Sequence, residues 1–101
     1  MFDKLVEAQK KAEEIKSRLD TISVNAEVEG GKISVTSTAN KYLTSIHIDP
    51  DFLKEADSEE LEELLLTAVN KALQQAEQVS QTEMQAATRD MMGGLGNLFG
   101  K

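Results

Sequence analysis

The sequence contains no cysteine and no tryptophan, and only one proline, three phenylalanines and one tyrosine occur among its 101 residues. The absence of cysteine excludes a disulfide scaffold and a thiolate metal site. With so few aromatics, the core must be built from Leu, Ile, Val and Ala, which suits packed helices. No run approaches the ~20 apolar residues of a membrane span, and the charged first residues do not resemble a signal peptide. We therefore expect one soluble, cytoplasmic domain without a membrane contact.

Positive charge is also scarce, since 11 Lys and Arg face 18 Asp and Glu and leave a net charge of −7. A global excess of acid disfavours a general polyanion binder, but phosphate binding depends on where the cations lie. Lys4, Lys11 and Arg18 recur every seven residues. Two interpretations stay open for them: solvated ion pairs with Glu7 and Glu14, or a row of cations that contacts a phosphate backbone.

Residues 2–20 have the pattern of an amphipathic helix. Apolar residues recur there at steps of three and four, which makes a narrow stripe of the kind that packs against another helix. The stripe consists of Leu5, Ala8, Ala12, Ile15 and Leu19.

Three short segments then alternate between apolar and polar residues, as half-buried strands do. Gly30-Gly31 lies between the first two, and its tolerance of positive φ predicts a two-residue hairpin turn. The third segment follows a turn at 39–42 and places Ile46 and Ile48 inward. The pattern predicts a three-stranded antiparallel meander with one apolar face, which a helix must cover. The three segments are 22–29, 32–38 and 43–49.

Two helix starts follow the third strand. Asp49 before the single proline fits the N-cap of a short helical turn, and Asp57 with Glu60 three residues later marks a second N-terminus. No Gly or Pro interrupts the chain from there to about Met92. The first half of this long helix has a wide apolar face that can cover a sheet, whereas the polar second half is expected to project from the body.

The predicted fold class is α+β, in the order helix, three-stranded meander, short helical turn and long C-terminal helix. We expect one domain over residues 1–92. Residues 93–101 are rich in glycine and predict a flexible tail.

No group of residues has the pattern of a catalytic site. His47 stands alone between two isoleucines of a strand, where a surface histidine is favoured over a metal ligand. The carboxylates gather at the start of the long helix, where the helix dipole stabilises them. The sequence therefore predicts a protein that is not an enzyme, with no cofactor, no metal and no small-molecule substrate.

Taken together, these features resemble the YbaB/EbfC family of nucleoid-associated proteins. The resemblance covers nearly all of residues 1–92. It rests on GGKISVT at the first hairpin, on IDP-x-x-L at Ile48, Asp49, Pro50 and Leu53, and on A-x-N-x-A at Ala68, Asn70 and Ala72.

This resemblance implies an intertwined homodimer whose helical ends project like the arms of tweezers. It also implies binding of double-stranded DNA at the bacterial nucleoid, mainly through phosphates with little base readout, and a role in nucleoid organisation and gene regulation. Thr44 and Ser45 stand where relatives often carry basic residues, so the charge would come chiefly from the helices. The candidate DNA-binding residues are Lys4, Lys10, Lys11, Lys16, Arg18, Lys32 and Lys41. The candidate dimer-interface residues are Leu5, Ala12, Ile15, Leu19, Leu65, Val69 and Leu73.

An alternative stays open. The acidic net charge and the apolar residues Leu95, Leu98 and Phe99 of the tail also fit a structural or adaptor dimer. Such a protein would bind another protein through the projecting helix and the tail.

Overall fold

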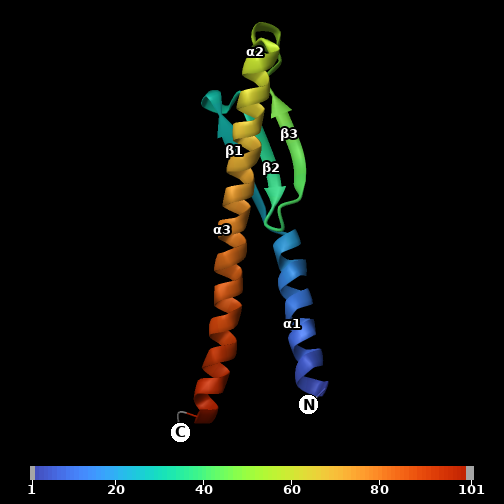
Figure 1. The fold of residues 1–101 in the computed structure, drawn as a ribbon, viewed down its shortest axis with the longest axis vertical. Coiled ribbons are helices and arrows are strands. Elements are labelled where there is room, and N and C mark those ends of the chain that lie inside the picture. Colours follow the sequence, from blue (N-terminus) through green and yellow to red (C-terminus); the bar gives the residue numbers. More distant parts are fainter. Residues whose placement is uncertain (1, 100–101) are drawn as a thin grey trace.

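The computed structural model describes residues 2–99, and the side chains of residues 3–89. It confirms the predicted α+β order and gives an elongated molecule with extents of 66 × 24 × 18 Å (Figure 1). The elements are α1 (Phe2–Asp20), β1 (Ser23–Val28), the 3-10 turn η1 (Glu29–Gly31), β2 (Ile33–Thr38), β3 (Leu43–Ile48), α2 (Pro50–Glu55) and α3 (Ser58–Phe99).

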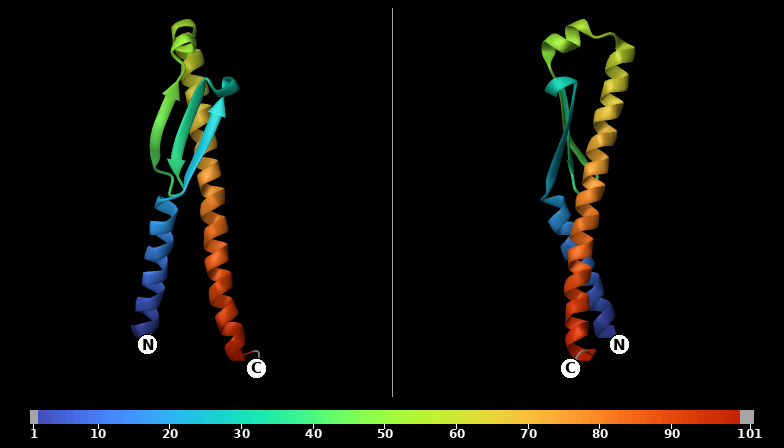
Figure 2. Two further views of the ribbon diagram at one scale, coloured as in Figure 1. Left: turned by 180° about the vertical axis from the view of Figure 1, so that it is seen from behind. Right: turned by 90° about the vertical axis from the view of Figure 1, so that its left-hand side faces the viewer.

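The three strands form an antiparallel sheet in the order β1-β2-β3. Directly paired residues share a face of the sheet, and the register places Ala26, Val35 and Ile46 side by side on the apolar face. The first half of α3 packs on this face (Figure 2). The helix approaches closely because the side chains that meet the sheet are small: Ala68 and Ala72, one turn apart, are both fully buried.

The cover is incomplete, and this differs from the sequence prediction. Ile46 lies on the apolar face, but 49% of its surface stays exposed, because α3 packs against β1 and β2 rather than β3. Leu43 is 37% exposed on the same strand. The pattern of alternation predicted the correct face for Ile46 but could not show how far one helix would extend across the sheet.

The predicted two-residue turn between the first strands is wrong. Val28 pairs with Ile33, so the loop contains the four residues 29–32. Three of them have positive φ: 53° at Glu29, 63° at Gly30 and 91° at Gly31. The loop is longer because Glu29 leaves the strand to form a tight turn, in which its carbonyl accepts a hydrogen bond of 3.2 Å from the Lys32 amide.

The backbone conformation of this loop predicts that Gly31 is more sensitive to substitution than Gly30. Gly30 lies in the left-handed well that other residues reach at about 1 kcal/mol, whereas the φ of Gly31 lies beyond that well. We expect Gly31→Ala to lower the free energy of unfolding by about 2 kcal/mol and Gly30→Ala by about half as much. Urea unfolding checks this. Equal costs would contradict it, since a Cβ at either position meets no atom closer than 3.5 Å.

Both predicted helix starts are confirmed. The Asp49 carboxylate accepts a hydrogen bond of 2.9 Å from the Phe52 amide, with Pro50 in the first turn of α2. The Asp57 carboxylate accepts one of 2.8 Å from the Glu60 amide at the start of α3. From there α3 runs for 42 residues, and its backbone continues as helix past residue 92. The division of the chain into a domain and a tail at that residue stays a prediction.

Candidate nucleic-acid interface

Two helical segments extend beyond the sheet in the same direction (Figures 1 and 2). We call α1 and the part of α3 after Ala76 the two arms. They touch near the sheet, where Leu19 is 4% exposed and Ile15 is half-buried. Farther along α1 the apolar stripe loses this cover, and Leu5 is 60% exposed. Within one subunit, only the half of the predicted stripe that lies near the sheet is buried.

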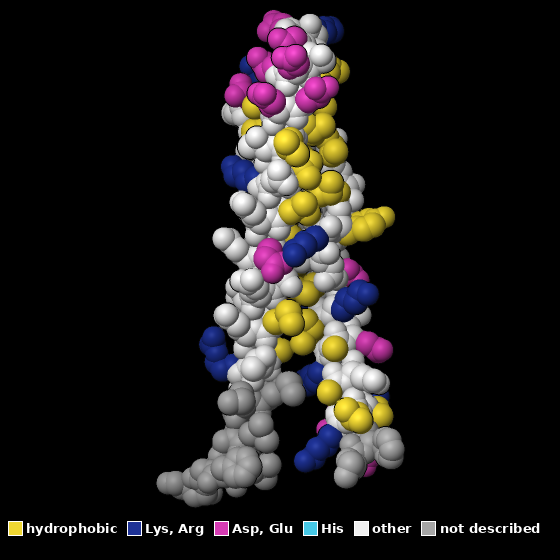
Figure 3. All heavy atoms as spheres, in the orientation of Figure 1, with side chains coloured by type: hydrophobic (Ala, Val, Ile, Leu, Met, Phe, Trp, Pro, Cys, Tyr) yellow, Lys and Arg dark blue, Asp and Glu magenta, His cyan; other side chains and the backbone are white. Residues whose placement is uncertain are grey.

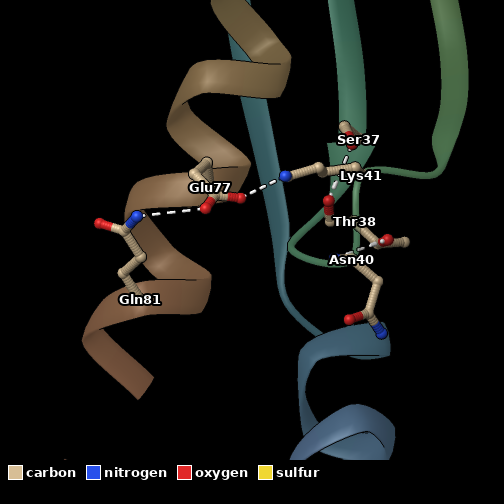
Figure 4. A network of polar contacts seen from close by, with 6 residues as sticks. All are labelled: Ser37, Thr38, Asn40, Lys41, Glu77 and Gln81. Atoms are coloured by element: carbon tan, nitrogen blue, oxygen red, sulfur yellow. Dashed lines mark hydrogen bonds and ion pairs between the residues drawn. The ribbon is translucent and has the colours of Figure 1, made fainter. Parts of the chain in front are cut away.

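The turn between β2 and β3 connects both arms (Figure 4). The Asn40 side-chain amide donates to the Lys16 carbonyl at 2.9 Å and to the Asp20 carboxylate, both near the end of α1. The next residue, Lys41, forms an ion pair with Glu77 of α3. This turn thus connects the two arms structurally.

The carboxylate of Glu77 is held in its charged form. Its hydrogen bond with Lys41, the positive charge of Lys41 and a further hydrogen bond from Gln81 together keep the pKa of Glu77 below the ordinary value for a glutamate. The Gln81 side chain donates that bond at 3.1 Å from the next turn of α3. The Glu77 carboxylate therefore keeps its negative charge beside Lys41 at neutral pH.

A second ion pair joins the arms farther from the sheet. Arg18 Nε lies 2.8 Å from Glu83 Oε1. Local spacing predicted Glu14 as the partner of Arg18, but the carboxylate comes from α3 instead. Glu14 pairs with Lys11 at 4.0 Å. All four side chains line one shallow hollow between the arms, together with Ile15, Ala86 and Ala87.

The seven candidate DNA-binding residues therefore fall into two groups. Lys11, Arg18 and Lys41 have carboxylate partners, and Lys32 lies 5.4 Å from the centre of the Phe52 ring. Within residues 3–89, whose side chains are described, the structure shows no ion pair for the other three, which are exposed on α1: Lys4, Lys10 and Lys16.

The acidic excess is confined to one end of the molecule. Residues 49–63 contain eight carboxylates and one lysine, which is a net charge of −7, the value for the whole chain. The rest of the chain has ten carboxylates and ten Lys or Arg, and within α1 five of each occur. Figure 3 shows the acidic side chains gathered at the tip formed by α2 and the start of α3. Of the two arms, α1 carries no excess of acid, whereas the arm of α3 has three carboxylates and one arginine.

The candidate dimer-interface residues also have different surroundings. Leu65 and Val69 are partly buried against the core of their own subunit, and Leu19 is almost fully buried. Leu5 and Ala12 are exposed, while Ile15 and Leu73 are half-buried. Their role in an interface stays a prediction.

Sequence reasoning missed a second apolar surface. Leu43 and Ile46 of β3 are exposed on the apolar side of the sheet, and Leu53 of α2 (48% exposed) and Leu66 of α3 (63% exposed) lie on the two helices that follow β3 in the chain. We call these four residues the β3 surface. The signal was present, because a wide sheet needs more than one helix to cover it.

The structure also shows the surroundings of His47, the single histidine. His47 is exposed and pairs in register with Ser34, on the face of the sheet opposite to α3. Within the described residues no three potential metal ligands come together, and no helix is long and apolar enough to cross a membrane. The side chains of Leu95, Leu98 and Phe99 lie outside the described residues, so the adaptor hypothesis stays a prediction.

Known proteins share this sequence and fold. A model of the YbaB/EbfC DNA-binding family matches residues 1–91. A nucleoid-associated protein of Flavobacterium johnsoniae is 39% identical over 102 residues, covering 98% of this chain and 94% of that protein. A second, from Clostridium botulinum, is 44% identical over 77 residues, covering 76% and 68% respectively. The solved structure of the uncharacterized protein HP0035 from Helicobacter pylori has a TM-score of 0.65, with 20% identity and coverage of 77% and 90%, and shows the fold alone.

Proposed function

Because the chain belongs to the YbaB/EbfC DNA-binding family, we propose that it is a nucleoid-associated protein of the bacterial cytoplasm that acts as a homodimer. It contacts duplex DNA mainly through the phosphate backbone, with little base readout. In this role it would organise the nucleoid and influence gene expression there.

The distribution of charge is the observation that carries this proposal. A chain with a net charge of −7 would be repelled by DNA if the charge were evenly spread. Here residues 49–63 have a net charge equal to that of the whole chain, and α1 presents exposed lysines on a neutral background. At physiological salt, charges act over about 8 Å, so the acidic tip has little effect on the distant arms.

Dimerisation is supported by the β3 surface. Four exposed large apolar side chains on neighbouring elements of a small protein are typical of an interaction site. A two-fold dimer would place this surface against its own copy, and each exposed cation would then occur twice. DNA binding needs this doubled set of contacts, because each single phosphate contact is weak and is lost as the salt concentration rises.

The proposal predicts that the exposed lysines of α1 contribute to DNA affinity. Replacing both Lys10 and Lys16 by Gln should weaken binding to a short duplex about tenfold at low salt, because each lost phosphate contact in a dimer is lost twice. The dependence of log affinity on log salt should become shallower by about 0.9 for each lost contact. Fluorescence anisotropy across a salt series measures both quantities.

The matched control removes the same charge elsewhere, with Lys54 and Lys71 replaced by Gln. Lys54 lies in α2 at the acidic tip, and Lys71 contacts the Glu27 carbonyl beside the sheet. This control should bind DNA almost as the wild type does. A loss of affinity as large as that of the α1 variant would mean that DNA affinity depends on net charge alone. Absence of binding by the wild type at low salt would refute the proposed function itself.

A further inference from the structure

Two of the candidate DNA-binding cations are already bound within the subunit. Lys41 is paired with Glu77 and Arg18 with Glu83, and both carboxylates come from the second arm, α3. The two glutamates are six residues apart on that helix and meet the end of α1 and the adjoining β2–β3 turn. Each of these carboxylates occupies the position beside a cation that a DNA phosphate would take.

These two ion pairs are accessible to water and to DNA. The side chains of Arg18 and Lys41 remain 69% and 50% exposed even with their partners in place. Exposed pairs of this kind typically contribute little to stability. A phosphate competes well against such a partner, because it forms equally strong charge-assisted hydrogen bonds and its neutralisation releases counterions condensed on the DNA.

We propose that Glu77 and Glu83 compete with DNA phosphates for Lys41 and Arg18, and thereby limit the affinity of this protein for DNA. The inference rests on the proposed function, and it assigns to two acidic residues of α3 a direct effect on binding. Each phosphate that reaches Lys41 or Arg18 displaces a carboxylate that also joins the two arms. DNA binding and the loss of these two ion pairs are therefore coupled events.

The two pairs differ in how the carboxylate is held. Glu83 is the less exposed of the two, at 20% against 44% for Glu77. Glu77 has the additional hydrogen bond from Gln81, so it keeps a donor when Lys41 turns to a phosphate. We expect both glutamates to oppose binding, and each to act only through its own cation.

The test replaces both glutamates by glutamine, which removes the charge and nearly preserves the shape. The variant Glu77→Gln/Glu83→Gln should bind a short duplex about tenfold more tightly than the wild type at low salt. Its salt dependence should steepen by about 0.9 for each cation that gains a phosphate contact. Each single variant is measured as well, so that the result does not depend on one protein preparation.

Two controls separate this mechanism from a simple change of net charge. Glu62→Gln/Glu63→Gln removes the same charge at the acidic tip and should leave the affinity within about threefold of the wild type, since it lies beyond the ~8 Å screening length from the arms. Glu83→Gln should have no effect in the background of Arg18→Gln, because the cation that it would free is absent. A double-mutant cycle of this kind isolates the coupling between the two residues.

The outcomes are distinct. If the wild type does not bind DNA, the proposed function fails. If the wild type binds and Glu77→Gln/Glu83→Gln gains no more than the control at the tip, the competition is refuted while the function stands. A weaker affinity of the variant also refutes it, because the ion pairs would then organise the arms for DNA. Circular dichroism of each variant establishes that the helices are intact.

Discussion

An aspartate in place of Ile46 should convert the protein into a folded monomer of 11.1 kDa. In a single subunit, Ile46 is already 49% exposed, so a carboxylate there keeps much of its water and the fold tolerates it. In the proposed dimer the same position is buried against the partner. A buried, unpaired carboxylate costs several kcal/mol, and two-fold symmetry applies this cost twice.

Sedimentation velocity at micromolar concentration measures the effect. His47→Asp is the matched control, because it adds the same charge at the next residue but on the opposite face of the sheet. We expect that control to sediment as the wild type does. A dimer of undiminished strength for Ile46→Asp would show that the β3 surface is not the interface. The monomer presents each DNA-binding cation once and the dimer presents it twice. The DNA affinity of the monomer should therefore fall well below that of the dimer.

The second large effect concerns the core. Replacing Ile33 by Ala should lower the free energy of unfolding by about 3 kcal/mol, because the side chain is fully buried and its removal leaves a cavity. Ile33 belongs to the cluster in which the sheet meets Ala68 and Ala72 of α3. Those alanines offer no long side chain that could move into the space.

Urea unfolding followed by circular dichroism checks this value, with all proteins at one concentration because a dimer is stabilised by mass action. Ser34→Ala serves as the control, since Ser34 is the next residue on the polar face and its replacement should change stability by less than about 0.5 kcal/mol. Equal losses for the two variants would mean that the sheet is not covered by α3 in solution.

Local patterns predicted the elements correctly because the period of apolar residues and the helix caps are properties of short segments. The caps at Asp49 and Asp57 are clear examples, since each needs only its own next three residues. Alternation also placed Ile33 and Val35 on the buried face. The length of the first hairpin loop was predicted wrongly, because the positive φ of Glu29 is unusual for that residue type.

The contacts between distant segments could not be predicted in this way. Sequence spacing gave Arg18 a partner four residues away, whereas the structure gives it Glu83, which lies 65 residues along the chain. The connection of both arms by Asn40 and Lys41 likewise depends on how α1 and α3 meet the sheet. Similarly, the exposure of Ile46 depends on where α3 crosses the strands, which no local pattern encodes.

The acidic tip gives each subunit a permanent electric dipole along its long axis. Its negative pole lies at residues 49–63, at one end of a body 66 Å long. A body of this kind near a polyanion experiences a torque as well as a force, and it rotates until the negative pole points away. Residues that never touch DNA would then select the approach in which the arms arrive first, so that more of the encounters between the two molecules are productive.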